Sequence, residues 1–255
     1  MTDFTTITAC GECCVGCSKR IEGSCPGCIE ADGRVPEWAG SGMCKIHACC
    51  KEHSARFCGL CSEFPCEKLP QMISWNPEIV QHLSVLRGEY IIRNISTKYA
   101  VRRLSDADIA DVIEFCEKNT LYYQYCPPFV SEESIRGDMN ALPTGKTMAD
   151  KYYVGFYDGE MLVAVLDLII SFPDKGTAYI GFFMVNTDVQ NGGIGSAIIS
   201  DLCSSLKQIG MDEVRLGWVQ GNPQAEHFWK KNRFVETGIT NETEDYIVVI
   251  ARKEI

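Results

Sequence analysis

The stretch FFMVNTDVQNGGIGSAII, residues 182–199, joins an apolar strand pattern to an apolar helix pattern through three glycines. The first N–H groups of a helix have no partner within the helix, and the helix dipole adds positive charge at that end. A glycine loop leading into a helix is therefore an anion site, and phosphate is its usual ligand. The stretch predicts a strand, a phosphate-binding loop and a helix in succession.

The segments on either side continue this alternation. Upstream we expect a strand at 98–104, a helix after Ser105, a tyrosine-rich loop at 121–129, a helix from Ser131 and a hairpin turning at Asp158-Gly159. Downstream we expect a strand at 213–219, a helix from Pro223 and two final strands at 234–239 and 246–253. This order predicts an α/β (α+β) domain with a mixed β-sheet and flanking helices.

Length and charge limit the classes of partner. A chain of 255 residues can hold one large domain or two small ones, and its net charge of −10 argues against general nucleic-acid binding. The same charge mildly favours a cationic partner such as an amine. The opening MTDFTTITACGE lacks the regions of a signal peptide, and the longest apolar run, 161–170, is too short to span a bilayer. We expect no membrane association and a cytoplasmic location.

The cysteines mark a separate N-terminal domain, because 12 of the 15 fall between Cys10 and Cys66. Two intervening residues let a tight turn aim two thiolates at one ion, and four thiolates make a closed tetrahedral zinc site. Four C-x2-C pairs can be drawn, namely Cys10/Cys13, Cys14/Cys17, Cys25/Cys28 and Cys58/Cys61. The pattern predicts one or two zinc ions or more, and a small domain with few large apolar residues needs such staples to fold.

Alternatives to zinc remain open at this point. Thiolate clusters also hold iron–sulfur centres, although the C-x2-C-x2-C-x3-C-P run is absent. Disulfides are a lesser alternative without a secretion signal, and His47 or His53 could each replace a sulfur ligand. A redox sensor that releases its metal on oxidation is a further hypothesis for this segment.

The cysteine-rich segment also resembles an uncharacterised family of small bacterial and archaeal domains that are taken to bind zinc. The resemblance covers about residues 8–95 and rests on the opening CG, the CPGC, the spaced Cys44 and Cys49, and the closing CGLCSEFPCEKL. Cys13 and Cys50 are extra to that pattern. The expected ligands are Cys10, Cys14, Cys17, Cys25, Cys28, Cys44, Cys49, Cys58, Cys61 and Cys66. We expect a metal-stapled domain at 1–68, a helical linker at 69–97 and the α/β domain at 98–255.

The glycine loop does not match two common phosphate-binding sequence motifs. No lysine follows the glycines as a Walker loop requires, and Gly193-Ile194-Gly195 lacks the third glycine of a dinucleotide fingerprint. Residues 190–195 instead read Q-x-x-G-x-G. Here the sequence resembles the GNAT acetyltransferases over nearly all of 98–255, and GNPQAEHFWKKNRFVETG, residues 221–238, resembles a second passage of that family. Thr187, Trp229 and Arg233 depart from the family pattern.

The resemblance implies acetyl-CoA as the ligand, held by ten residues. Backbone N–H groups from Asn191 to Ser196 would hold the pyrophosphate, and backbone groups of Met184 and Val185 would pair with the pantetheine arm. The Val185 N–H would polarise the thioester carbonyl, and Asn222 would either bond the arm or cap its helix. The full set is Met184, Val185, Gln190, Asn191, Gly192, Gly193, Ile194, Gly195, Ser196 and Asn222.

The catalytic residues stay unknown at this level. Trp229 stands where the family often has a tyrosine acid, and Gly217 stands near the position of a glutamate base found in some members. Other residues could in principle act as the acid, the base or a nucleophile, namely Asp167, Tyr122, Tyr123, Tyr125, Tyr246 and Cys126. Asp167 is also readily explained as a solvated strand residue. The leading hypothesis is direct acetyl transfer to a small-molecule or peptide amine, and a non-catalytic acyl-CoA-binding or metal- or redox-sensing protein is the alternative.

Overall fold

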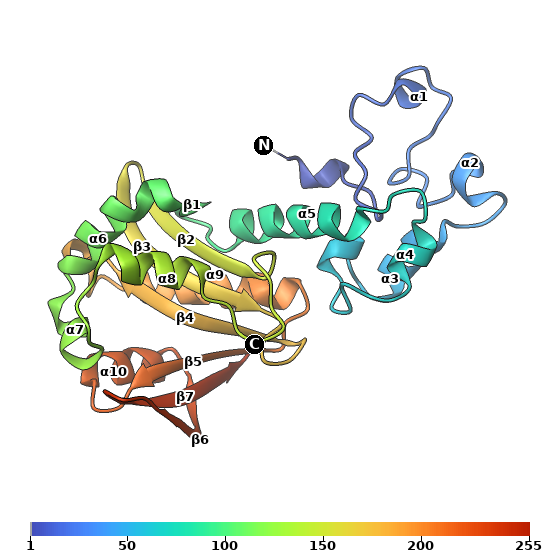
Figure 1. Cartoon of the computed structure of the whole chain (residues 1–255). Coiled ribbons are helices and arrows are strands. Elements are labelled where there is room, and N and C mark those ends of the chain that lie inside the picture. The colour runs from blue at the N-terminus through green and yellow to red at the C-terminus, as the bar shows by residue number, and fades with distance from the viewer. Residues whose placement is uncertain (1) are drawn as a thin grey trace. The chain divides into compact units, whose positions relative to one another are not determined.

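The computed structural model describes residues 2–255 and divides into two compact units, Met1–Tyr90 and Ile91–Ile255 (Figure 1). The boundary falls inside the segment 69–97 that the sequence analysis treats as a linker. Within the described part of the chain, no helix is long and apolar enough to cross a membrane.

The first unit consists of short helices joined by turns, because glycines and cysteines interrupt every apolar run. Its elements are η1 (Phe4–Thr6), α1 (Ser18–Ile21), α2 (Pro36–Ala39), α3 (Lys45–Glu52), η2 (Cys58–Leu60), α4 (Leu69–Met72) and the first part of α5 (Ile79–Asn94). Leu83 of α5 is fully buried and packs close to two cysteine-bearing turns. A Cβ added at Gly11 would lie 2.7 Å from the Leu83 side chain, and one at Gly59 would lie 2.7 Å from the Leu83 carbonyl oxygen. Glycine is therefore required where these turns meet the helix.

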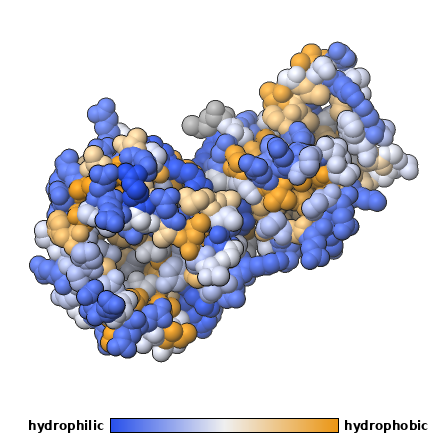
Figure 2. Space-filling model, in the orientation of Figure 1, coloured by the Kyte–Doolittle hydropathy of each residue, from blue (hydrophilic) through white to orange (hydrophobic). Residues whose placement is uncertain are grey.

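The core of the first unit is small. Phe4 packs edge-on against Tyr90 at 5.1 Å between ring centroids and lies parallel to Phe57 at 6.2 Å. Several large apolar side chains remain exposed, and Figure 2 shows hydrophobic residues at the surface of this unit. They include Val15, Ile21, Ile29, Trp38 and Trp75.

The second unit is a seven-stranded mixed sheet with helices on both faces (Figure 1). Its strands are β1 (Ala100–Arg103), β2 (Lys151–Asp158), β3 (Met161–Ile170), β4 (Thr177–Val185), β5 (Glu213–Val219), β6 (Val235–Glu242) and β7 (Ile247–Glu254), in the spatial order β1-β2-β3-β4-β5-β7-β6. Its helical elements are the end of α5, η3 (Asp106–Asp108), α6 (Ile109–Glu117), α7 (Thr120–Tyr125), α8 (Glu132–Asn140), η4 (Thr187–Val189), α9 (Ile194–Gln208) and α10 (Pro223–Lys231). The predicted mixed sheet with flanking helices is confirmed.

Helix α7 corrects one sequence prediction. The sequence predicts a tyrosine-rich loop at 121–129. Its first half is instead helical, with Asn119 at the N-cap, and Tyr122 packs edge-on against Phe182 of β4 at 5.7 Å between ring centroids. Tertiary packing on the sheet stabilises a helix that the local sequence does not favour.

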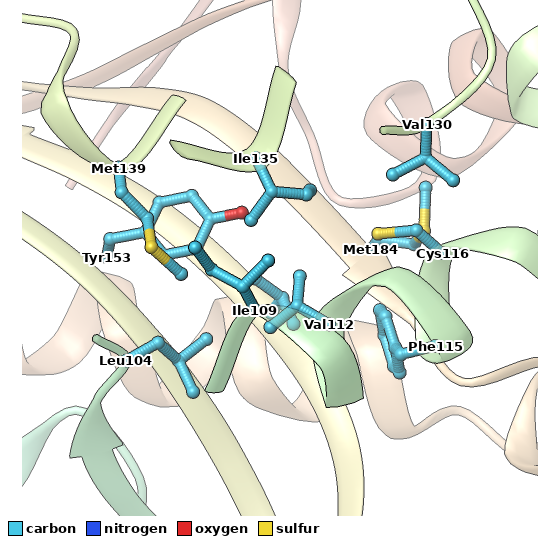
Figure 3. Packing of buried hydrophobic residues seen from close by; sticks show 11 residues of the cluster. Leu104, Ile109, Val112, Phe115, Cys116, Val130, Ile135, Met139, Tyr153 and Met184 are labelled. Carbon is cyan, nitrogen blue, oxygen red and sulfur yellow. The ribbon is translucent and has the colours of Figure 1, made fainter. Parts of the chain in front are cut away.

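The face of the sheet under α6 and α8 carries a hydrophobic core cluster (Figure 3). Figure 3 shows Tyr153 of β2 beside Met139 and Ile135 of α8, and Met184 of β4 belongs to the same cluster. The Tyr153 ring is buried, and its hydroxyl has no hydrogen-bond partner in the described structure. Because the Met184 side chain is buried in this core, it anchors β4 to the helices that cover the sheet.

One ion pair is buried in the sheet. Lys151 of β2 is 1% exposed and its Nζ lies 2.7 and 2.8 Å from the two carboxylate oxygens of Asp167 on β3. Burial raises the pKa of Asp167, and the contact with Lys151 opposes that rise. The interpretation of Asp167 as a solvated strand residue is therefore wrong, because the hairpin places it against a buried lysine.

We expect Asp167→Ala to lower the free energy of unfolding by about 3–5 kcal/mol, because it leaves the Lys151 ammonium buried without a partner. The double variant Lys151→Met with Asp167→Leu should recover most of the loss, since an apolar pair of similar size removes the unpaired charge. Urea unfolding, with hydrogen exchange followed at β2 and β3, measures both variants. A loss below about 1 kcal/mol for Asp167→Ala would contradict the role of the pair.

Candidate functional site

A channel of about 500 Å³ runs through the second unit between the C-terminal halves of β4 and β5. The start of α9 borders it at one end, α10 forms one side, and Tyr122, Cys126 and Tyr246 border it elsewhere. The channel combines apolar walls with backbone and side-chain polar groups, so it is the candidate functional site.

The channel exists because two neighbouring parallel strands separate. Thr177–Ile180 of β4 pair with Glu213–Leu216 of β5, and within the described structure the residues that follow on β4 have no partner on β5. A β-bulge lies at this point, since Asp167 and Leu168 of β3 are opposite Phe182 and Ile180 and leave Gly181 as the extra residue. A bulge bends its strand and increases the local twist. A Cβ at position 181 would lie 2.8 Å from the Asp167 carboxylate, so the buried ion pair packs directly against the bulge.

Beyond the bulge, the edge of β4 offers backbone groups to the channel. The Asn186 N–H donates to the Val163 carbonyl at 2.8 Å, and Val185 is opposite Ala164. Backbone groups alternate in direction along an antiparallel ladder, so the N–H groups of Val185 and Phe183 point away from β3, toward the side of β5. By the same alternation the N–H and carbonyl of Met184 point to β3. Met184 therefore borders the channel without offering it a backbone bond, and Phe183 shares that role with Val185.

The glycine loop leads into α9 as the sequence predicts. Gly193 is the N-cap residue in a left-handed conformation, with φ of 79°, and Asn191 also has a positive φ of 64°. A Cβ at Gly195 would lie 3.0 Å from the Phe228 ring of α10 and 3.3 Å from Val185. The first turn of α9 thus approaches both walls of the channel closely, and its N–H groups have no partner within the helix.

The structure brings nine of the ten predicted ligand residues to the channel wall. These are Met184, Val185, Gln190, Asn191, Gly193, Ile194, Gly195, Ser196 and Asn222, whereas Gly192 does not border the channel. Asn222 is buried and its side-chain oxygen accepts from the Ala225 N–H at 3.1 Å, so it caps α10. Its capping role is therefore observed, and a second role toward a ligand would use its remaining amide group.

Gln190 has a structural function that sequence reasoning missed. Its Nε2 donates to the Val185 carbonyl at 2.9 Å and to the Asn119 Oδ1 at 2.8 Å. The Gln190 side chain therefore connects the end of β4 to the junction of α6 and α7, and both of its amide hydrogens are used in these two hydrogen bonds. The two partners lie 5 and 71 residues away along the chain, so no local sequence pattern predicts these hydrogen bonds.

Three protic side chains meet at the channel. Tyr122, Cys126 and Tyr246 all border it, and the Cys126 thiol lies close enough to both phenols to affect their pKa values. Hydrogen bonding to Cys126 and burial raise the pKa of Tyr246 to about 12. Burial is the main reason that the pKa of Tyr122 lies well above its ordinary value. Both phenols therefore keep their protons at neutral pH.

The positions where the family pattern has an acid and a base hold neither. Trp229 borders the channel, is buried and packs against Phe228 at 4.8 Å and Phe234 at 5.2 Å between ring centroids. A Cβ at Gly217 would lie 2.5 Å from Val248, so β7 fills the space above this glycine. Of the other candidates for acid or base, Asp167 is ion-paired with Lys151 and Tyr125 does not border the channel. Tyr123 lies edge-on against Tyr122 and also does not border the channel.

The cysteines of the first unit form two groups. Cys28 lies within electrostatic range of Cys10, Cys14, Cys25 and Cys44. Five others line one small cavity beside Phe64 and Leu69, namely Cys49, Cys50, Cys58, Cys61 and Cys66. Cys50, which the sequence pattern treats as extra, is buried with its sulfur 3.6 Å from that of Cys58, whereas the expected ligand Cys17 is exposed.

This arrangement of cysteines does not show the predicted structural zinc site. Across residues 2–255, no three His, Cys, Asp or Glu side chains are placed closely enough to hold a metal ion. The Nε2 atom of His47 contacts the Asp32 carboxylate at 3.0 Å.

Comparison with known proteins agrees with the geometry of the second unit. Residues 118–234 match the model of a family described as "Acetyltransferase (GNAT) family". This stretch contains β4, the glycine loop, α9, β5 and α10. Residues 118–234 are therefore a GNAT acetyltransferase domain.

Solved structures with the same fold are distant in sequence. An acetyltransferase from Thermus thermophilus is 14% identical, with a TM-score of 0.50, and the match covers 62% of this chain and 97% of that one. The spermidine N-acetyltransferase of Vibrio cholerae, solved with CoA and spermine, is 17% identical over 62% and 96% of the two chains, with a TM-score of 0.48. The search of curated proteins found no match. The first comparison shows the fold and no more.

We expect Gln190→Ala to lower the free energy of unfolding by about 1–2 kcal/mol, because two hydrogen bonds are lost. Amide exchange in residues 119–126 should become faster, since that segment loses its tie to β4. Gln224→Ala, at an exposed position of the channel wall, is the matched control and should change neither quantity. Unchanged exchange in Gln190→Ala would show that the tie does not hold α7 in place.

Proposed function

We propose that the second unit catalyses transfer of an acetyl group from acetyl-CoA to an amine by direct attack of the amine on the thioester. The observation that carries this proposal is the channel itself, which joins an unpaired strand edge at β4 to a helix start formed by the glycine loop. The membership of residues 118–234 in the GNAT acetyltransferases supports it.

Two parts of acetyl-CoA match the two ends of this channel. The N–H groups at the start of α9 suit the pyrophosphate, because they are unpaired within the helix and carry the positive end of its dipole. The extended arm of CoA carries amide groups, which suit the edge of β4 at Phe183 and Val185 as an added strand would. The close approach of Gly195 to Phe228 leaves no room for a side chain where the two parts join.

Positioning supplies much of the rate in such a transfer. Holding the thioester beside the amine replaces a bimolecular encounter. The Val185 N–H is directed to the channel side of β4 and is the donor we assign to the thioester oxygen, where negative charge develops. The acceptor is a small-molecule or peptide amine, and the net charge of −10 favours one that arrives as a cation.

Gly195→Val tests the assignment of the loop. Its branched side chain would collide with Phe228 and enter the channel, so we expect the affinity for CoA to fall at least about tenfold. Gly192→Ala is the control, because a Cβ there meets only the Val189 carbonyl oxygen at 3.7 Å. Calorimetry measures both, and equal affinity for CoA in the wild type and Gly195→Val would contradict the assignment.

Turnover separates catalysis from simple binding. The wild-type chain is incubated with acetyl-CoA and butylamine, spermidine or a peptide with an N-terminal alanine, and released CoA is measured by chromatography because thiol reagents also react with the chain's cysteines. Amine-dependent CoA release is expected. CoA binding without turnover on any of these amines would favour the non-catalytic acyl-CoA-binding alternative.

We also propose that the first unit binds zinc. What supports this is the grouping of its thiols. Cys49, Cys50, Cys58, Cys61 and Cys66 border one cavity, and Cys10, Cys14, Cys25 and Cys44 all lie within electrostatic range of Cys28. Four thiolates are the donor set of a closed structural zinc site, and each of the two groups contains enough cysteines to supply one. The thin core of this unit gives metal binding a structural purpose.

Metal analysis of the purified chain tests this second proposal. We expect about two zinc ions per chain, one for each group of cysteines, and Cys61→Ser should remove about one of them. Cys13→Ser is the matched control, because the exposed Cys13 belongs to neither group, and it should leave the zinc content unchanged. A chain without bound metal, or equal zinc in Cys61→Ser and the wild type, would contradict the proposal.

A further inference from the structure

The channel opens on both faces of the sheet. Phe182 and Phe183 are neighbours on β4, so their rings point to opposite faces. The Phe182 ring packs edge-on against Tyr122 of α7 at 5.7 Å between ring centroids, and the Phe183 ring stacks on Phe228 of α10 at 5.9 Å. All four residues border the channel, so one of its openings lies beside α7 and the other beside α10.

The α10 opening carries basic side chains. His227 and Lys231 are four residues apart on this helix, so they share one helix face, and both border the channel. The proposed donor, CoA, carries its negative charge on phosphate groups, which basic side chains attract. The donor therefore suits the α10 side of the channel, and the α7 opening is left for the amine.

The α7 opening is lined by aromatic rings. Tyr122 of α7, Phe182 of β4 and Tyr246, from the turn before β7, border the channel and are each half-buried. Tyr246 belongs to this opening because it lies within electrostatic range of Cys126 at the end of α7. Three separate segments of the chain thus present flat apolar surfaces to one place.

The aromatic surface continues outward from the channel. The Tyr122 ring packs edge-on against Tyr123 at 5.0 Å between centroids, and Tyr123 packs against Phe129 at 4.9 Å. Phe129 is exposed at the end of this row. A ring bound between Tyr122 and Phe182 would therefore meet further apolar surface on the side of solvent.

The side chains of the α7 opening suit an amine without charge. The Tyr122 and Tyr246 phenols keep their protons at neutral pH, so they form hydrogen bonds but do not neutralise a cation. Asp138 of α8 and Asp245 are the carboxylates that act on these phenols, and in the described structure neither borders the channel. Burial of an ammonium group beside neutral side chains is unfavourable, because no partner offsets its desolvation.

The chemistry of the attack leads to the same preference. Only an uncharged amine has the lone pair that attacks a thioester, and an alkylamine as basic as a lysine side chain is less than about 0.1% uncharged at pH 7. Such an amine must first lose a proton to a base. In an aromatic amine the ring delocalises the lone pair, so the nitrogen stays uncharged at this pH. The net charge of −10 acts on cations at long range, whereas the wall acts on the bound amine.

We propose that the acceptor is an aromatic amine that is uncharged at neutral pH, with its ring packed against Tyr122, Phe182 and Tyr246. The inference rests on the proposed acetyl transfer. The amine lone pair forms the N–C bond, and the C–S electron pair moves to sulfur. The nitrogen then loses one proton to water and the CoA thiolate takes one proton from water, so the products are an N-aryl acetamide and CoA.

Two isomeric amines test the charge of the acceptor. Para-toluidine and benzylamine have the same formula and both carry a benzene ring, but only benzylamine is protonated at pH 7. We expect kcat/KM for para-toluidine to exceed that for benzylamine at least about tenfold. An equal or higher value for benzylamine would overturn the inference while leaving acetyl transfer intact. No CoA release with any amine would remove the proposed function and this inference with it.

Asp138→Asn tests whether a carboxylate outside the channel wall serves as the base. We expect kcat/KM for both isomers to match the wild type, because Asp138 does not border the channel. Glu133→Gln, on the same helix, is the matched control. A loss in Asp138→Asn that is confined to benzylamine would show that Asp138 takes the ammonium proton, and it would overturn the inference.

Leucine variants test the ring contact. Tyr122→Leu and Tyr246→Leu should each raise KM for para-toluidine about three- to tenfold, whereas Tyr122→Phe keeps the ring and should match the wild type. Trifluoroethylamine, a weakly basic amine without a ring, should keep its wild-type KM in all three variants. An unchanged KM for para-toluidine in both leucine variants, or equal changes for the two amines, would overturn the inference.

Discussion

The second unit depends on the separation of β4 from β5 after four paired residues on each strand. A sheet normally satisfies both edges of an internal strand, and here one edge of β4 is left for a ligand. The bulge at Gly181 starts the separation, and the buried pair of Lys151 and Asp167 packs against it. The strand edge, the channel and the approach of α9 to α10 all follow from this interruption of the ladder.

Helix α7 completes the channel because long-range contacts hold it there. Gln190 fixes its start to the end of β4, and Tyr122 rests on Phe182. The same glutamine belongs to the glycine loop, so a single residue couples the anion-binding end of the channel to the acyl end. Gln190 thus brings the glycine loop, the end of β4 and the start of α7 together although they are far apart in sequence.

The sequence predicts whatever is set locally. The glycine loop, the Asp158-Gly159 hairpin and the apolar stripe of α9 each carry their own signal, and the structure confirms these elements. Local sequence patterns cannot predict features that depend on contacts between residues far apart in the chain. Helix α7 forms through packing on β4, and Asp167 is buried because the hairpin sets it against Lys151. Tyr246 and Cys126 border the same channel because the fold brings them there. In the first unit, spacing identifies C-x2-C pairs, but the grouping of Cys50 with Cys58 depends on how the turns pack around α5.

The central claim is that CoA lies between β4 and β5 with its pyrophosphate at the start of α9. A crystal structure of the chain with CoA tests it most directly. The account predicts pyrophosphate oxygens on the N–H groups of residues 193–196, and the pantetheine arm paired with Phe183 and Val185. CoA bound elsewhere, or bound in the channel with its pyrophosphate away from α9, would contradict it.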